Sequence, residues 1–193
     1  MPNWTENYVK INANQDVLDT IQKELTDDTA NGLDLTKAYP MPDVFNDMLQ
    51  GATTINGERH DVWRVDADGN HVAIPEVEQI EIINKYGTTQ PVDWQYNNWG
   101  TKWGDCETTF IRVNENNLDI EFRSAWGEPF LLLNELANKY NVTFTNHWEI
   151  ELNEGSGTTY YPFPNGDEVK EDHIKTLNEM RSTTRSIVKR GML

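Results

Sequence analysis

The stretch TTFIRVNENNLDIEF, residues 108–122, decides the fold. Apolar and polar side chains alternate before and after residues 114–117, and alternation with a period of two is the pattern of a half-buried β-strand. The Asn and Glu side chains between the two alternating runs are typical of a turn. The stretch is therefore predicted to form a β-hairpin with strands over residues 108–113 and 118–122.

Helices and strands are predicted on both sides of this hairpin. A helix over residues 129–140 follows it, and residues 142–152 then alternate as a long strand. Residues 8–12 alternate as a first strand, and Asn14 can cap a helix whose apolar positions are Val17, Leu18, Ile21 and Leu25. The order strand, helix, two strands, helix, strand predicts a ferredoxin-like split βαβ sandwich, an α+β fold.

Two parts of the chain extend beyond this core. A large insertion, residues 43–104 approximately, contains a predicted hairpin over 61–74 and a helix from Pro75 to Gly87 with an apolar side formed by Val77, Ile80, Ile82 and Ile83. Residues 154–157 are predicted to be a flexible break before an amphipathic C-terminal helix over residues 167–190. The expected organisation is a ferredoxin-like domain over 1–154 and a C-terminal extension over 155–193 that is mainly helical.

Four short motifs support this architecture through a resemblance. They are Pro2-Asn3-Trp4 with Asn7, Pro40-Met41-Pro42, Asn98-Trp99-Gly100-Thr101-Lys102-Trp103, and Ala125-Trp126. In this order they resemble the YubB-type ferredoxin-like proteins of phages and plasmids, over the chain up to residue 152. The chain departs from that pattern at Thr5, where Cys is expected, and at residues 127–128, where Gly-Glu replaces Ser-Pro. The resemblance implies a phage-type accessory protein with a ferredoxin-like core, and it transfers no catalytic residues.

The charge of the chain favours some partners over others. The sequence carries 32 acidic and 16 basic side chains, for a formal charge of -16, and residues 1–154 hold 27 of the acidic and 10 of the basic ones. A body this negative repels phosphate, so direct nucleic-acid binding is not expected and a partner protein with a basic surface is favoured. The alternative is that the acidity only keeps the protein soluble.

The sequence also favours a cytoplasmic location. No apolar run approaches the roughly 20 residues that span a bilayer, and the first residues lack the basic and apolar segments of a secretory signal. A single cysteine, Cys106, is consistent with a reducing compartment. We therefore expect no membrane association and a cytoplasmic protein, in the host cell if it is phage-encoded.

The sequence shows no recognisable catalytic or metal-binding constellation. Asp66-Ala67-Asp68-Gly69-Asn70 resembles part of a calcium loop, but the remaining ligand positions fall on Arg64 and Pro75, so a turn is predicted. The histidines are scattered without ligand spacing, at His60, His71, His147 and His173. No metal, no cofactor and no enzymatic activity are predicted; an enzyme whose groups are assembled in space, with carboxylates beside His147 or His71, stays open.

The tryptophan-rich motif has two interpretations. Trp94, Trp99, Trp103 and Trp126 can stack single-stranded bases, because aromatic side chains on a ferredoxin-like sheet form such platforms. Few cations lie near them to meet phosphates, so a structural role in the core is the favoured interpretation. The motif residues concerned are Trp4, Trp94, Trp99, Gly100, Thr101, Lys102, Trp103 and Trp126.

Acidic helix faces are the candidates for partner binding. They are formed by Asp16, Asp19, Glu24, Asp27 and Asp28 around the first helix and by Glu76, Glu78 and Glu81 on the Pro75 helix. Carboxylates repeated at the spacing of phosphates can imitate nucleic acid, whereas a solvated helix face is the simpler explanation. The predicted function is inhibition of a host nucleic-acid-handling or defence protein; the alternative is a single-stranded nucleic-acid-binding module. A homodimer through the C-terminal helix is also open.

Overall fold

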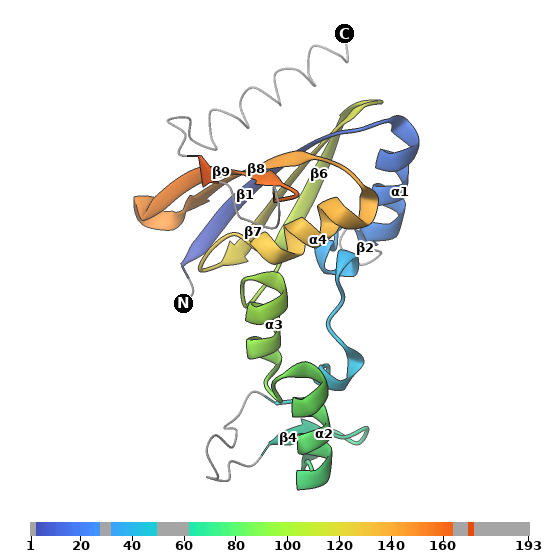
Figure 1. The fold of residues 1–193 in the computed structure, drawn as a ribbon, viewed down its shortest axis with the longest axis vertical. Coiled ribbons are helices and arrows are strands. Elements are labelled where there is room, and N and C mark those ends of the chain that lie inside the picture. Colours follow the sequence, from blue (N-terminus) through green and yellow to red (C-terminus); the bar gives the residue numbers. More distant parts are fainter. Residues whose placement is uncertain (1–2, 28–31, 50–61, 164–169, 172–193) are drawn as a thin grey trace.

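A six-stranded antiparallel sheet forms the centre of the molecule. The computed structural model describes residues 3–27, 32–49, 62–163 and 170–171. In the order β10-β9-β8-β1-β7-β6, the strands are Lys170–Glu171, Gly155–Tyr161, Phe144–Ile150, Trp4–Asn12, Asn117–Ala125 and Cys106–Asn114. Helix α1 (Gln15–Leu25) follows β1, and helix α4 (Phe130–Tyr140) connects β7 to β8 (Figure 1). The inner order β8-β1-β7-β6 is ferredoxin-like, so the predicted α+β fold is confirmed.

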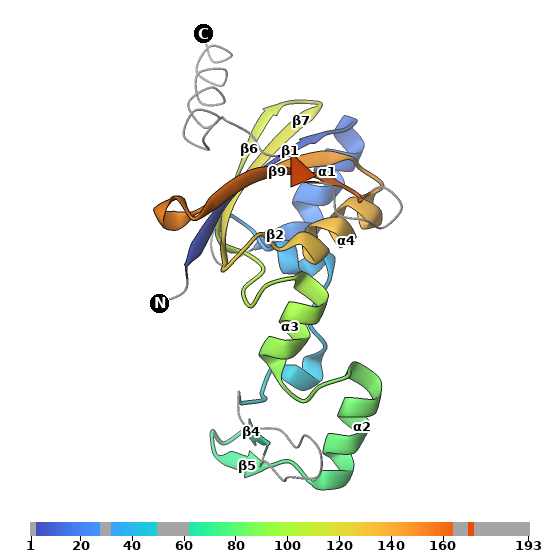
Figure 2. The ribbon, with the colours of Figure 1, turned by 60° about the vertical axis from the view of Figure 1, so that its left-hand side comes forward.

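Both helices cover the same face of the sheet (Figure 2). Val9, Ile120 and Phe144 project from the strands into a core that also contains Leu18, Ile21 and Leu25 of α1 and Leu132, Leu133 and Leu136 of α4. Helix α1 begins where predicted, because the Asn14 side chain accepts a hydrogen bond from the Val17 backbone N–H at 3.0 Å. The other face of the sheet carries none of these core residues.

The sheet continues beyond the predicted domain limit at residue 154. Residues 155–157, predicted as a flexible break, instead begin β9, which pairs with β8 along its whole length. A Cβ atom at Gly157 would lie 2.9 Å from the indole ring of Trp148, so the absence of a side chain there gives this ring its space. Of the C-terminal helix predicted over residues 167–190, only 170–171 are described, and they form strand β10 and not a helix, because they pair with β9. The rest of the predicted helix lies outside the described residues.

The segment between α1 and β6 forms an arm that extends away from the sheet (Figures 1 and 2). Two strands of two residues each and a 3-10 turn lie near the sheet. The predicted hairpin and the predicted helix after Pro75 are confirmed and lie at the far end of the arm. The elements are β2 (Thr26–Asp27), β3 (Gly32–Leu33), η1 (Leu35–Ala38), η2 (Asp43–Phe45), β4 (Trp63–Val65), β5 (His71–Ala73), α2 (Glu76–Tyr86) and α3 (Pro91–Trp99). Helix α3, which the tryptophan-rich sequence did not reveal, leads back from the arm to the sheet.

The predicted apolar side of α2 is wrong in one respect. Ile82 is buried, whereas Val77, Ile80 and Ile83 are 70%, 51% and 39% exposed. At 100° per residue, Ile82 lies on the side of the helix opposite to the stripe formed by the other three. The four side chains therefore do not share one face, and only the Ile82 side of α2 packs into the core.

Candidate functional site: an acidic pocket beside the sheet

A hollow of about 480 Å³ lies between the β2–β3 ribbon and the start of β6. Four carboxylates line it, from Asp27, Asp34, Asp105 and Glu107, and its lining includes no lysine, arginine or histidine. We call this hollow the acidic pocket. It gathers negative charge from segments far apart in the sequence, and one of its carboxylates, Glu107, is paired with Arg123 outside the lining at 3.1 Å.

Local hydrogen bonds hold two of these carboxylates in place. Asp34 caps the η1 turn, where its Oδ1 accepts from the Thr36 backbone N–H at 2.9 Å. Asp105 precedes β6 and accepts from the Leu35 backbone N–H at 3.0 Å and from the Thr108 hydroxyl at 2.8 Å. Asp105 therefore ties η1 to the beginning of β6, and both carboxylates have fixed positions.

The pocket changes the protonation of its groups. Burial raises the pKa of Asp105 to about 6; the hydrogen bonds from Leu35 and Thr108 oppose this rise, and the charges of Asp34 and Asp27 add to it. Burial and the neighbouring carboxylates also raise the pKa of the Cys106 thiol. The thiol is therefore protonated at neutral pH, as expected for a poor nucleophile.

Asp105 lowers the stability of the folded chain when it is ionised. Its pKa rises from 3.8 to about 6 on folding. The stability that the protonated carboxyl gives the folded state is therefore fully present below pH 3.8 and is lost as the pH rises through 6. We expect Asp105→Asn, whose amide oxygen still accepts both hydrogen bonds, to raise the free energy of unfolding by about 1–3 kcal/mol at pH 7. At pH 3, below both pKa values, the two proteins should be equally stable. Urea denaturation at both pH values measures this, and a destabilised variant at pH 7 would contradict it.

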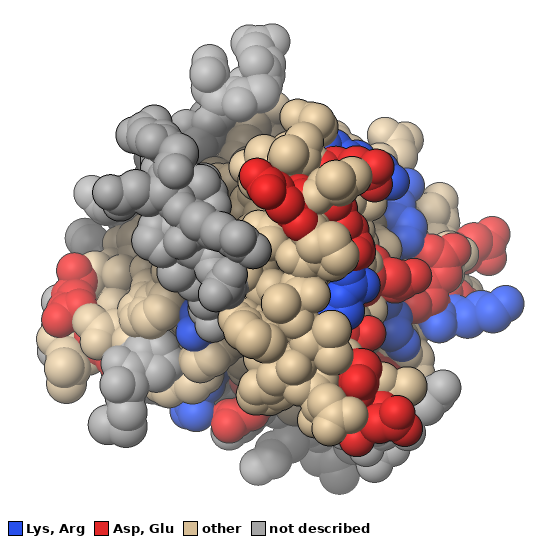
Figure 3. All heavy atoms as spheres, turned by 90° about the horizontal axis from the view of Figure 1, so that it is seen from below, with Lys and Arg blue, Asp and Glu red and all other residues tan. Residues whose placement is uncertain are grey.

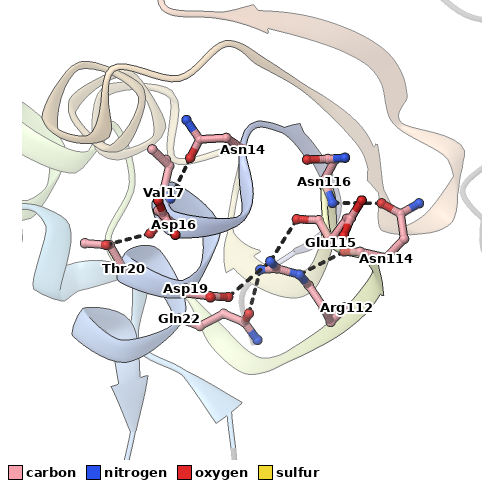
Figure 4. Close-up of polar contacts among 10 residues, drawn as sticks. All are labelled: Asn14, Asp16, Val17, Asp19, Thr20, Gln22, Arg112, Asn114, Glu115 and Asn116. Carbon is pink, nitrogen blue, oxygen red and sulfur yellow. Dashed lines mark hydrogen bonds and ion pairs between the residues drawn. The ribbon is translucent and has the colours of Figure 1, made fainter.

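The acidic residues predicted around α1 are mostly engaged within the fold. Asp19 forms an ion pair with Arg112 at 3.1 Å, and Arg112 also donates to Gln22 and to backbone carbonyls of the β6–β7 turn (Figure 4). Glu24 lies 3.5 Å from the ammonium of Lys139 and accepts from Tyr140 at 3.0 Å. Asp16 is exposed, Asp27 lines the acidic pocket, and Asp28 lies outside the described residues.

The second predicted acidic face lies on the arm, away from the first. Glu78 of α2 is paired with Arg64 of β4, and Glu76 and Glu81 are exposed. Helices α1 and α2 are at opposite ends of the molecule (Figure 1), and the arm end shows carboxylates in separate groups around an uncharged area (Figure 3). The predicted residues thus do not form one continuous row of negative charge.

The tryptophan motif splits into a buried half and an exposed half. Trp94 and Trp99 are buried, and the Trp99 indole N–H donates to the Tyr39 carbonyl at 2.8 Å. Gly100 ends α3 with φ +84°, and the buried Thr101 hydroxyl donates to the Ala125 carbonyl. Trp94 and Trp99 thus pack α3 against Tyr39 and Phe45, and Gly100 and Thr101 join its end to α4 and β7. This is the structural role favoured by the sequence.

The exposed half forms a ladder of aromatic rings around one lysine. Trp4 stacks on Trp103 at 5.8 Å between ring centroids, and Tyr96 stacks on Trp126 at 6.1 Å. The Lys102 ammonium lies 4.7 Å from the Trp103 ring and 5.6 Å from that of Trp126. Trp103 and Trp126 are 37% and 48% exposed, so packing in the core does not describe these two.

A buried carboxylate, Glu128, is not among the functional residues that the sequence predicts. Glu128 is 5% exposed, and its oxygens accept from Thr159 at 2.6 Å, Asn146 at 2.9 Å and Tyr161 at 3.2 Å. Burial, followed by the negative charge of Glu128, raises the pKa of the Tyr161 hydroxyl well above its usual range. Glu128 therefore joins the β7–α4 connection to β8 and β9 through neutral donors.

Comparison with known proteins agrees with this architecture. Residues 98–187 match a family model. The model is described as the ferredoxin-like domain in Api92-like protein. The chain is also similar to the crystal structure of protein api92 from Yersinia pseudotuberculosis, with a TM-score of 0.53 and 12% sequence identity over 91% of this chain and 99% of that chain. At this identity the likeness shows the fold alone. No curated protein matches the chain.

The described part of the chain contains neither a metal-binding cluster nor a membrane-spanning helix. No group of three or more His, Cys, Asp or Glu side chains there is arranged to hold a metal ion. No helix there has the length and apolar character needed to cross a bilayer. His147, which the sequence placed beside Glu149 on a strand, contacts Thr158 through Nδ1 at 2.6 Å and does not line the acidic pocket.

Proposed function

We propose that this chain is a non-enzymatic binding module whose acidic pocket takes a lysine or arginine side chain of a partner protein. The observation that carries the proposal is the gathering of four carboxylates around one hollow with no basic residue in its lining. A guanidinium group would compensate this charge and donate to two carboxylates at once. It would also favour the ionised form of Asp105, so that binding offsets the cost of burying that charge.

We propose further that the chain is a phage-type accessory protein that acts in the host cytoplasm. A net charge of -16 attracts basic protein surfaces at long range, and many such surfaces hold nucleic acid. Occupation of a nucleic-acid groove by this chain would inhibit a host nucleic-acid-handling or defence protein. Asp19, Glu24 and Glu78 already have cationic partners, and so does Glu107 of the pocket. In the described part of the chain Asp34 and Asp105 accept hydrogen bonds from neutral donors alone, so the acidic pocket and not the two helix faces is the proposed contact.

Titration with an arginine-rich peptide tests the acidic pocket as a cation site. We expect the double variant Asp27→Asn, Asp34→Asn to weaken binding by about tenfold, which corresponds to about 1.4 kcal/mol. Asparagine retains the side-chain oxygen that caps η1, so the fold should persist. The matched control Asp16→Asn, Glu81→Gln removes the same charge from exposed positions outside the pocket. Calorimetry at low and moderate salt measures both, and equal losses in the two variants would reject the pocket as the site.

The exposed aromatic ladder supports one second candidate, single-stranded nucleic-acid binding. Trp103 and Trp126 offer exposed ring surface, and Lys102 between them provides a cation for a phosphate. A titration with short oligothymidine at low salt, followed by tryptophan fluorescence, distinguishes it. Quenching that is lost in Trp126→Ala would support this candidate, and unchanged fluorescence would remove it. The net charge leads us to expect no binding above low salt.

A further inference from the structure

The face of the sheet opposite to α1 and α4 is acidic and has no described helix over it. The strand register places Glu6, Lys10, Asp119, Glu121, Arg123 and Glu149 on this face, together with Tyr8, Ile111, His147, Thr158 and Tyr160. We call it the open face. Its carboxylates outnumber its cations, and Arg123 is engaged by Glu6 at 2.7 Å and by Glu107 at 3.1 Å.

The open face nevertheless contains side chains that water does not reach. Tyr8 and Thr158 are 0% exposed and Asp119 is 6% exposed, and the Tyr8 hydroxyl donates to Asp119 at 2.5 Å. On this face the Lys10 ammonium lies 5.2 Å from the centroid of the Tyr8 ring. One lysine side chain covers only part of a tyrosine ring, so on an otherwise uncovered sheet face the rest of the ring would be exposed to solvent. The burial of this pair indicates that a covering layer belongs on the open face.

The position of β10 identifies a segment that can supply this layer. β10 pairs with β9 at the edge of the sheet, and the chain continues from there through residues 172–193. A helix over that length would be about 33 Å long, and six strands span about 24 Å, so the segment can cross the whole face.

The composition of residues 172–193 complements the open face. The segment holds five basic side chains against two acidic ones, Asp172 and Glu179; the basic ones are Lys175, Arg181, Arg185, Lys189 and Arg190. Its apolar residues Ile174, Leu177 and Met180 recur at helical spacing. A partly apolar face with an excess of carboxylates matches an apolar stripe flanked by cations.

We propose that residues 172–193 dock on the open face of their own chain and form its second layer. The apolar stripe contacts Tyr8, Ile111 and Tyr160, and the basic side chains lie beside Asp119, Glu121 and Glu149. Docking would also screen these carboxylates from other basic partners. The proposal does not depend on the acidic pocket, which lies at the β6 edge of the sheet.

Zero-length carbodiimide cross-linking of the full chain tests the docking. We expect covalent links from Lys175 or Lys189 to Asp119, Glu121 or Glu149, identified by mass spectrometry. An equimolar mixture of ¹⁵N-labelled and unlabelled protein distinguishes the two sources of the segment, because links within one chain contain a single isotope. Links of which about half are of mixed isotope, as random pairing of two chains gives, would show that a second copy supplies the segment and would overturn the proposal.

Two variants keep the test independent of the cross-linking chemistry. Ile174→Ser with Leu177→Ser retains both lysines and should reduce the links several-fold, and hydroxyl-radical oxidation of Tyr160 should rise several-fold. The control Val77→Ser, on the exposed stripe of α2, should change neither readout. Absence of the links in the wild-type chain, or oxidation of Tyr160 that is the same in the wild type and the Ile174/Leu177 variant, would refute docking on the open face.

Discussion

Replacing Gly100 by alanine is expected to destabilise the chain by about 3 kcal/mol, through a steric contact and a backbone conformation together. A Cβ atom at this position would lie 2.7 Å from two ring carbons of Phe130, a distance at which one group must move. Phe130 packs against the core at the start of α4, so its ring cannot move freely. In addition, φ at Gly100 is +84°, a region that side chains with a Cβ rarely adopt.

Gly87 provides a matched control for this prediction. It ends α2 as Gly100 ends α3, with a similar φ of +79°, but a Cβ atom there meets nothing within 4 Å. Gly87→Ala should therefore cost only the backbone component, about 1 kcal/mol. Denaturation of both variants in urea isolates the contact with Phe130 as the difference between them. Equal losses would show that the α3–α4 contact does not constrain the motif.

Replacing Glu128 by alanine is the second change with a large expected effect, a loss of about 3 kcal/mol. Alanine would leave the buried donors of Asn146, Thr159 and Tyr161 without their carboxylate acceptor. A buried polar group without a partner costs more than the hydrogen bond itself contributes, and three groups are affected. The unfolding free energy from urea titration measures this loss.

Two controls separate the Glu128 network from a general effect of charge. Glu135→Ala removes an exposed carboxylate from the neighbouring helix α4 and should change stability by less than about 0.5 kcal/mol. Tyr161→Phe should cost less in the Glu128→Ala background than in the wild type, because its acceptor is already gone. Strictly additive losses would show that the two side chains do not interact.

The ferredoxin-like core could be predicted because its signals are local. The alternation in residues 108–122, the Asn14 cap and the Pro at position 129 each specify one element, and the order of the elements then specifies the fold. Strand β9 could not be predicted in this way. Its glycines indicate a break when the sequence is considered alone, and their purpose depends on Trp148 of the neighbouring strand.

The candidate site depends on contacts that sequence order does not reveal. Asp27, Asp34 and Asp105 come from three segments that the fold brings together, and only Asp27 belonged to a predicted acidic face. Exposure of Trp126 depends on where α3 ends relative to β7, which no local pattern encodes. Glu128 had no local signal either, because its burial depends on Asn146 of β8 and on Thr159 and Tyr161 of β9.

The place of β1 in the sheet has a consequence for the order of events during synthesis. This first strand of the chain lies between β7 and β8, and Asn7 donates to Ser124, 117 positions later in the sequence. During synthesis β1 leaves the ribosome first, and it can pair only after the arm, β6 and then β7 or β8 have been synthesised. Strands β6 to β9 and α4, by contrast, form from contacts between adjacent segments. We therefore expect β1 to pair last, between the β6–β7 pair and the β8–β9 pair, which form without it.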